Sequence, residues 1–387
     1  MKKRMIIITL FVLLGSVLAA CGPAEEDAVE PIKLGWLGAL SGDQSVWGTA
    51  EYNGVKLTLE QINEEGGILG RPVEIVYYDG KGEQLEYINV LKRLIYEDEV
   101  VGVIGQNSSG NQIAMAPIAE EGKVPIISTF ATNPRVTVPE EGQLMEYTFR
   151  VCFIDPYSGE VMAKFAWEDL GAKTAAVLYD ISSDYSTGVR DYFVQAWEGL
   201  GGELVADEAM KAGDVDFRPQ LTSIKEADPD VIIMPLLFKE VALSANQARE
   251  LGITATMLGG DGWPSLQLLE IAGPAVEGSY YIDHADVKAE AITEFREQYK
   301  EAYDKDIEIT AVMGHDALML MKAAIEKAGE AEPEAIRDAL ETISGVKVLS
   351  GTINMDPETH NPEGKAAVII KIENGEFVYY KTFEPME

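Results

Sequence analysis

The chain has 387 residues, enough for two ordinary domains that each bury a core. Its 47% hydrophobic and 25% charged residues are typical of a folded globular protein rather than a disordered one. The formal net charge of −34 excludes a large basic face, so we expect no nucleic-acid partner.

The first twenty residues are typical of a secretion signal. A basic start, Met1–Arg4, precedes an apolar run over Met5–Val17 that is shorter than the roughly 20 residues of a membrane-spanning helix. The next residues, Leu-Ala-Ala-Cys21, look like a bacterial lipobox, and acyl chains on Cys21 would supply a membrane anchor. The alternative is an ordinary secretory signal with an incidental cysteine. We predict a signal peptide over 1–20, a lipidated N-terminus and acidic tether over 21–31, and an extracytoplasmic, lipid-anchored location.

Strand and helix patterns alternate from Ile32 onward in two series. The first series has strands at 32–37, 73–78, 100–104 and 124–127, and helices at 52–62, 85–96 and ending near 121. The second has strands at 174–179, 203–206, 231–234 and 256–259, and helices near 159–170, 185–200, 217–226, 241–251 and after Pro264. A strand at 278–282, helices at 289–303, 311–327 and 333–343, and a hairpin of 365–372 with 376–382 complete the chain.

This alternation predicts an α/β fold with two doubly wound, Rossmann-like lobes on parallel sheets. Helices of the right length to complete the first lobe come after the second series, which predicts that the chain crosses between lobes more than once. We assign residues 32–151 plus 283–349 to lobe 1 and residues 152–282 plus 350–387 to lobe 2.

Little in the sequence indicates catalysis or metal binding. Cys152 lies in an apolar strand and is expected to be a small buried residue. The histidines, His284, His315 and His360, show no metal-ligand spacing, and no cofactor-binding glycine fingerprint occurs at the strand–helix turns. We therefore expect no enzyme, no cofactor and no metal.

Ligands of open parallel sheets bind at the carboxyl ends of the strands, so the loops there are the candidate site. Ser108 and Ser109 begin a helix after one strand, and Thr132 lies in the hydroxyl-rich loop after the next. Hydroxyls and free N–H groups suit an anion, although serine is also an ordinary helix cap. Because neither loop has a Lys or Arg, a single carboxylate fits better than a phosphate.

The loops of the second lobe have other chemistry. Asp261, on a glycine-flanked turn, is suited to a cation, and Tyr185 begins a helix. Trp47 is a candidate apolar wall in a first-lobe loop. Each has a plainer alternative: Asp261 as the cap of the short helix after Pro264, Tyr185 as a packing aromatic, and Trp47 packing its own loop. Together the residues favour a zwitterion with an apolar side chain, held between the lobes.

The chain resembles the leucine/isoleucine/valine-binding branch of the type 1 periplasmic-binding-protein superfamily from about Ile32 to its C-terminus. Asn-Glu-Glu-Gly-Gly-Ile-Leu-Gly-Arg-Pro, over 63–72, is the most specific match. Other matching segments are Ile32–Gly42, Tyr52–Leu57, Gly105–Gly110, Ala131–Pro134, Asp184–Gly188, Gln247–Gly252 and Gly259–Gly262.

The resemblance implies a fold of two lobes joined by a three-strand hinge, and a protein that delivers solute to an ABC permease without performing chemistry. By the same resemblance, Ser109 and Thr132 would bind the carboxylate of the ligand, while the Ala131 carbonyl and Asp261 would bind its ammonium. Tyr185 would reach the ligand from the second lobe, and Trp47 would cover its aliphatic part. Leu237 stands where this branch often has an aromatic residue, which leaves the side-chain preference open.

We therefore expect a monomeric binding protein for a branched-chain or similar apolar amino acid, with ABC permease subunits as partners. Two alternatives remain. The same fold can bind another small solute, namely a different amino acid, an amide or urea, or an aromatic or small carboxylate. It can also serve as a tethered sensory receptor.

Overall fold

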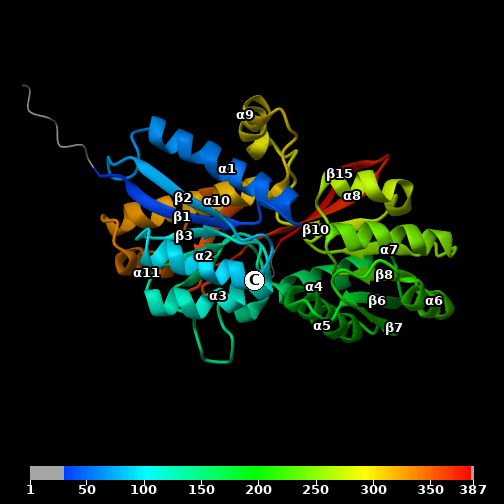
Figure 1. Cartoon of the computed structure of the whole chain (residues 1–387). Helices are drawn as coiled ribbons and strands as arrows, with labels where there is room; N and C mark the ends of the chain where they lie inside the picture. The colour runs from blue at the N-terminus through cyan, green and yellow to red at the C-terminus, as the bar shows by residue number, and fades with distance from the viewer. Residues whose placement is uncertain (1–29, 385–387) are drawn as a thin grey trace, which may run out of the picture.

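The computed structural model describes residues 30–384, so the predicted signal peptide, Cys21 and most of the acidic tether lie outside the described residues. The chain forms two lobes that lie side by side (Figure 1). Within residues 30–384, no helix is both long and apolar enough to span a membrane.

The first lobe is built on a five-stranded parallel sheet with the order β2-β1-β3-β4-β5. Apolar residues of α2 and α3 cover one face of this sheet, and those of α1, α10 and α11 form the core on the other. The strands are β1 (Ile32–Gly38), β2 (Val73–Asp79), β3 (Val103–Gly105), β4 (Ile126–Ser128) and β5 (Thr148–Arg150). The helices are α1 (Ser45–Glu64), α2 (Gln84–Tyr96), α3 (Ser109–Gly122), α9 (Thr293–Tyr303), α10 (Ile309–Ala328) and α11 (Pro333–Glu341).

The second lobe has a seven-stranded sheet with the order β15-β14-β10-β9-β8-β6-β7, in which β6 to β10 are parallel and β14 and β15 form the predicted antiparallel hairpin. Helices α4 and α5 pack on one face and α6, α7 and α8 on the other. The strands are β6 (Thr174–Asp180), β7 (Glu203–Met210), β8 (Val231–Met234), β9 (Thr256–Gly259), β10 (Tyr280–Asp283), β14 (Ala367–Glu373) and β15 (Glu376–Phe383). The helices are α4 (Asp155–Lys164), α5 (Asp184–Gly199), α6 (Arg218–Ala227), α7 (Phe238–Glu250) and α8 (Leu266–Ala272).

The chain crosses between the lobes three times: after β5, after β10 and before β14. Helix α10, which follows all the parallel strands of the second lobe, packs against α1 of the first. This return explains the helices that are out of order in the sequence, and it confirms the predicted α/β fold with two lobes.

The predicted boundary at residue 350 differs from the structure. We expected the second lobe to resume at residue 350, but Ile353 and Met355 pack in the core of the first lobe. They lie on β12 (Gly351–Met355), in a small sheet with β11 (Val346–Val348) and β13 (Pro362–Glu363). The two side chains are two residues apart on one strand and thus face the same apolar core, and the second sheet resumes only at β14.

Cys152 is fully buried, as the sequence predicted, but it follows the end of β5 and packs in the core of the first lobe, although residue 152 was assigned to the second. Burial raises the pKa of its thiol to about 12. The thiolate form that reacts is therefore negligible near neutral pH.

Candidate binding site between the lobes

The loops after β3 and β4 meet at the carboxyl edge of the first sheet, because these strands are direct neighbours. Gly105 permits the tight exit from β3: its φ is +112°, and a Cβ there would lie 2.4 Å from the Leu37 carbonyl oxygen. Helix α3 then begins at Ser109, after Ser108, whose side chain makes no cap hydrogen bond. The first N–H groups of α3 thus remain available at its positive end.

Ser109 joins the two loops. Its Oγ accepts a hydrogen bond from the backbone N–H of Asn133 at 3.2 Å, next to Thr132. Thr132 is fully buried, and its Oγ1 has no hydrogen-bond partner among residues 30–384. A buried hydroxyl without a partner costs free energy, so this atom is suited to a bound ligand.

The buried side chain of Arg150 holds the loop after β4 in place through hydrogen bonds. Arg150, on β5, donates from Nη1 to the Ala131 carbonyl at 2.6 Å and from Nη2 to the Asn133 carbonyl at 3.0 Å. The predicted ammonium acceptor at Ala131 therefore already has one donor, and only its second lone pair remains for a ligand. Its role toward an ammonium stays a prediction.

Asp261 and Tyr185 face this edge from the second lobe. The Tyr185 hydroxyl accepts from the backbone N–H of Gly262 at 3.1 Å, and burial raises its pKa well above the usual value. Asp261 Oδ1 is buried and has no hydrogen-bond partner within the described chain. The cap of helix α8 is Ser265, whose Oγ accepts from the backbone N–H of Gln267 at 3.3 Å. The alternative interpretation of Asp261 as a helix cap is therefore wrong.

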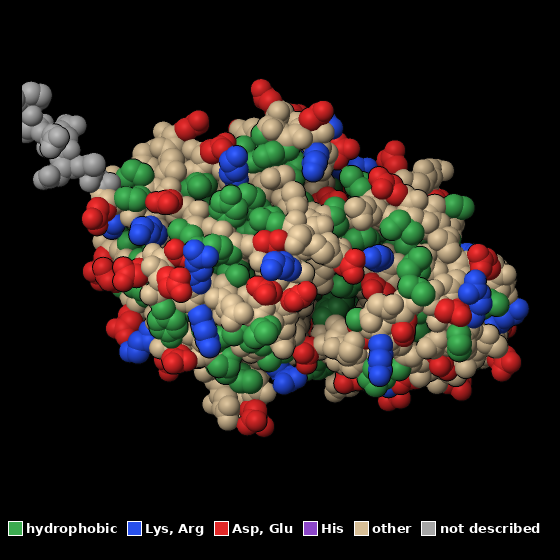
Figure 2. Space-filling view, in the orientation of Figure 1, with side chains coloured by type: hydrophobic (Ala, Val, Ile, Leu, Met, Phe, Trp, Pro, Cys, Tyr) green, Lys and Arg blue, Asp and Glu red, His purple; other side chains and the backbone are tan. Residues whose placement is uncertain are grey.

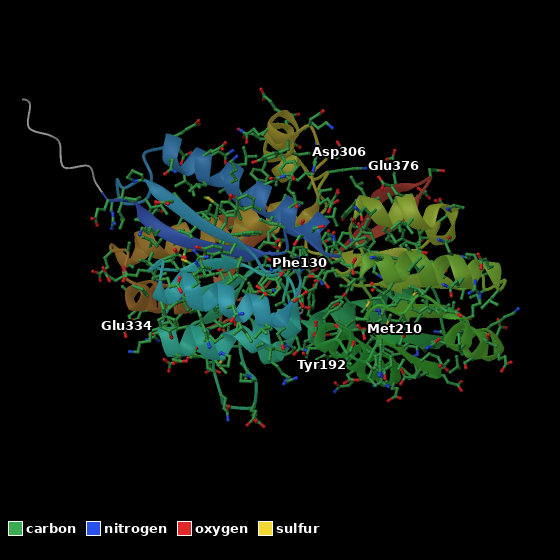
Figure 3. The ribbon with its side chains drawn as sticks, viewed as in Figure 1. Phe130, Tyr192, Met210, Asp306, Glu334 and Glu376 are labelled. Carbon is green, nitrogen blue, oxygen red and sulfur yellow. The ribbon has the colours of Figure 1, made fainter. Side chains whose placement is uncertain are left out.

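Trp47 crosses from α1 to the second lobe rather than packing only its own loop. Its indole N–H donates to the Pro264 carbonyl at 2.8 Å, and its ring meets the Phe238 ring edge-on with centroids 5.0 Å apart. Trp47 and Leu237 line a cavity of about 30 Å³ together with Asn107, Phe130, Tyr185, Asp261, Gly262, Pro264 and Thr310. Figure 3 shows Phe130 at the junction of the lobes, and the surface there is hollowed (Figure 2).

Polar contacts also join the two lobes at the rim of this site. Asn133 Nδ2 donates to the Asp184 carbonyl at 2.8 Å, and Arg135 forms an ion pair with the Asp184 carboxylate at 2.9 Å. Lys239 and Asp43 form a second ion pair across the gap at 2.7 Å. The lobes are thus closed on each other around the predicted residues.

The sequence reasoning missed two buried groups of this site. Asp155, fully buried at the start of α4, lies against Thr132 and Asn133, and burial raises its pKa well above the usual value. His284, just after β10, contacts Asp261 Oδ2 through Nε2 at 3.1 Å. Both follow the ends of sheet strands, which is the signal that locates the other site residues.

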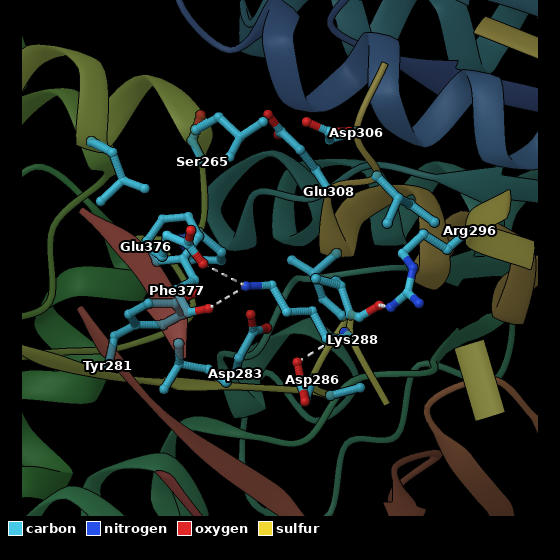
Figure 4. Close-up of a pocket in the computed structure, with 18 of the residues that line it drawn as sticks. Ser265, Tyr281, Asp283, Asp286, Lys288, Arg296, Asp306, Glu308, Glu376 and Phe377 are labelled. Atoms are coloured by element: carbon cyan, nitrogen blue, oxygen red, sulfur yellow. Dashed lines mark hydrogen bonds and ion pairs between the residues drawn. The ribbon is translucent and has the colours of Figure 1, made fainter. Parts of the chain in front are cut away.

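A larger cavity, of about 680 Å³, lies on the hinge side between α8, α9 and the β14–β15 hairpin (Figure 4). Its lining contains none of the predicted ligand-binding residues. Two of its basic groups already have partners: Lys288 donates to the Phe377 carbonyl at 3.0 Å, and Arg296 donates to the Val287 carbonyl at 3.1 Å. Of the predicted residues, Trp47, Tyr185, Leu237 and Asp261 line the smaller cavity, and none lines the larger one.

The chain is similar to known proteins in sequence and in structure. The sequence profile of the periplasmic binding protein family matches residues 31–376. The chain is 28% identical to "Leu/Ile/Val-binding protein homolog 1" of Brucella suis, over 95% of this chain and 96% of that protein.

Two of the similar solved structures share 30% or more of their residues with this chain. The leucine binding protein LivK of Thermotoga maritima is 34% identical, with a TM-score of 0.85, over 92% of this chain and 99% of that one. LivJ of Streptococcus pneumoniae in complex with isoleucine is 30% identical, with a TM-score of 0.84, over 92% and 100%. A Rhodopseudomonas palustris solute binding protein in complex with benzoate, at 22% identity and a TM-score of 0.80, shares the fold. The chain is a member of the periplasmic binding protein family.

Proposed function

We propose that this protein is the substrate-binding lipoprotein of an ABC importer and that it binds a branched-chain or similar apolar amino acid between its lobes. One observation carries the proposal most directly. Asp261 Oδ1 and Thr132 Oγ1, which come from opposite lobes, are both buried without a hydrogen-bond partner within the described chain, and Asp155 lies near both side chains. The site thus has a free anionic acceptor on one side and a free hydroxyl beside the N-terminus of α3 on the other.

The charges favour a ligand with both an ammonium and a carboxylate. Asp261 and Asp155 are two buried acids, and a cation between the lobes would offset the free energy of burying the Asp261 carboxylate. We assign the ammonium to Asp261 and the second lone pair of the Ala131 carbonyl. We assign the carboxylate to Ser109, Thr132 and the first N–H groups of α3, with Ser108 beside them.

The remaining walls suit an aliphatic side chain. Trp47, Phe130 and Leu237 are apolar and line the same cavity as Asp261 and Tyr185. The names of similar proteins support this choice, since LivJ was solved with isoleucine and LivK is described as a leucine binding protein. A benzoate-like acid would leave Asp261 without a cation.

The proposed transport role depends on closure of the two lobes around the ligand. A ligand that touches both lobes stabilises the closed state, and a permease that docks on that state receives the solute. We propose that Cys21 anchors the protein to the membrane beside its ABC permease, and that the protein acts as a monomer with no cofactor.

Calorimetric titration of the mature protein with amino acids, urea and benzoate tests the proposal. Leucine, isoleucine or valine should bind, and Asp261→Asn should weaken binding at least about 30-fold, because losing one member of a buried charge pair costs about 2 kcal/mol or more. Asp304→Asn is the matched control, since the Asp304 side chain is fully exposed. Binding of benzoate but of no amino acid would refute the proposed ligand class.

A further inference from the structure

His284 lies in a rigid aromatic setting beside the candidate site. Its ring is tilted against Phe153, with centroids 3.9 Å apart, and meets Phe130 edge-on at 4.8 Å. The side chain is fully buried. These contacts from both sides restrict the rotation of the imidazole, so its nitrogen atoms point in fixed directions.

One of those nitrogen atoms contacts the acid that we assign to the ammonium. His284 Nε2 lies 3.1 Å from Asp261 Oδ2. Because a carboxylate only accepts hydrogen bonds, Nε2 carries the proton of this bond. The other nitrogen, Nδ1, is buried and has no hydrogen-bond partner among the described residues, as fits an unprotonated atom.

The pair bears one negative charge when the imidazole is neutral. Burial lowers the pKa of His284, and the hydrogen bond to Asp261 opposes this shift only in part. A neutral donor orients the carboxylate without cancelling its charge. Asp261 therefore stays available to a cation.

The strand order explains why these two side chains meet. β9 and β10 are parallel neighbours, with Tyr281 paired to Gly259, so their carboxyl ends lie together. Asp261 follows β9 by two residues and His284 follows β10 directly. The adjacent Asp283, in contrast, lines the larger hinge cavity (Figure 4), since successive residues of a strand face opposite sides.

We infer that His284 is a positioning residue for ammonium recognition: it holds Asp261 Oδ2, so that Oδ1 remains directed at the ligand. The inference rests on the proposed function, because it deepens the role of Asp261. His284 does not touch the ligand itself. It favours ligands with a protonated amine, since an oriented carboxylate repels an anion in that position.

A double-mutant cycle measured by calorimetry with leucine tests this role. His284→Leu removes the donor and should weaken binding about 10-fold or more, as expected when a hydrogen bond to a charged group is lost. In an Asp261→Asn background, His284→Leu should change the leucine affinity by less than about twofold, because its effect acts through Asp261. His284→Gln, whose amide nitrogen reaches a similar position, should bind leucine within about threefold of the wild type.

His360→Leu is the matched control, since His360 is also buried and stacks on Phe149 at 4.0 Å, in a place that does not line the site. An equal loss from His284→Leu in both backgrounds, or no loss at all, would overturn the positioning role. The role would also be overturned if His284→Gln bound leucine as weakly as His284→Leu while unfolding at the same temperature as the wild type.

The ¹⁵N shifts of His284 test the bond apart from the ligand. The ligand-free protein should show a neutral imidazole protonated at Nε2, and Asp261→Asn should change its shifts. A proton on Nδ1, or identical shifts in the variant, would overturn the inference. If the wild type shows the expected shifts but binds no amino acid, the proposed function fails while the His284–Asp261 pair stands.

Discussion

Replacing Trp47 by phenylalanine should weaken ligand binding, because it removes one hydrogen bond between the lobes. The indole N–H donates to the buried Pro264 carbonyl at 2.8 Å, while the edge contact with Phe238 would survive in a phenyl ring. Loss of the donor leaves the carbonyl unpaired in the closed state, at a cost of about 1–3 kcal/mol. Water satisfies both groups in the open state, so the whole cost opposes closure.

The expected loss of leucine affinity is therefore about 5- to 150-fold. Calorimetry measures the affinity, and small-angle scattering with saturating leucine measures the population of the closed form. Trp47→Leu should lose more, because the aromatic pair contributes a further ~0.5–1.5 kcal/mol. The matched control is Trp167→Phe, since Trp167 is half-buried in the second lobe and packs under Lys173. Wild-type affinity in Trp47→Phe would refute the idea that Trp47 stabilises closure.

Three further predictions concern stability, reactivity and location. Burial raises the pKa of Glu51 from 4.5 to about 7, so wild-type stability should fall as the pH rises through this window. In urea unfolding, the free energy of unfolding of Glu51→Gln relative to that of the wild type should rise by about 3 kcal/mol from pH 4.5 to pH 8. A difference that does not depend on pH would contradict this. Iodoacetamide should label Cys152 at pH 8 only after unfolding; equal labelling of the native protein would count against its burial. Cys21→Ser should move the protein from the membrane fraction to the soluble fraction, whereas unchanged fractionation would argue against lipidation.

The fold could be predicted because the hydrophobic patterns of helices and of strands are both strong along most of the chain. Apolar strands alternate with helices of regular length, which allows little other than parallel sheets with crossovers. The late helices also indicated a return to the first lobe, and α10 does pack there. The last crossing was placed too early, because short strands such as β12 do not reveal from their sequence which core they join.

The candidate site could be predicted in part, because the ends of parallel strands gather at one edge of a sheet. This reasoning reached Ser109 and Thr132, whose loops a hydrogen bond joins, and Asp261, which lines the cavity between the lobes. It missed His284 and Asp155, because the segments that follow β10 and β5 lack the glycine and hydroxyl residues that mark the other loops. Their roles depend on which strands are neighbours, and the order of strands in a sheet is not visible in the linear sequence.

The buried acid Glu51 shows a further limit. An acid within an amphipathic helix ordinarily faces water, yet Glu51 accepts hydrogen bonds from Trp36 at 3.0 Å and from Thr129 at 2.8 Å. These partners lie on β1 and in the loop after β4, far from Glu51 in the sequence, so only the folded structure reveals them.

A crystal structure of the mature protein grown with leucine tests the central claim most directly. Leucine should lie between the lobes, with its ammonium within hydrogen-bond distance of Asp261 Oδ1 and its carboxylate at Ser109 and Thr132. Its side chain should contact Trp47 and Leu237. Leucine bound instead in the larger hinge cavity, or with its carboxylate toward Asp261, would contradict the account.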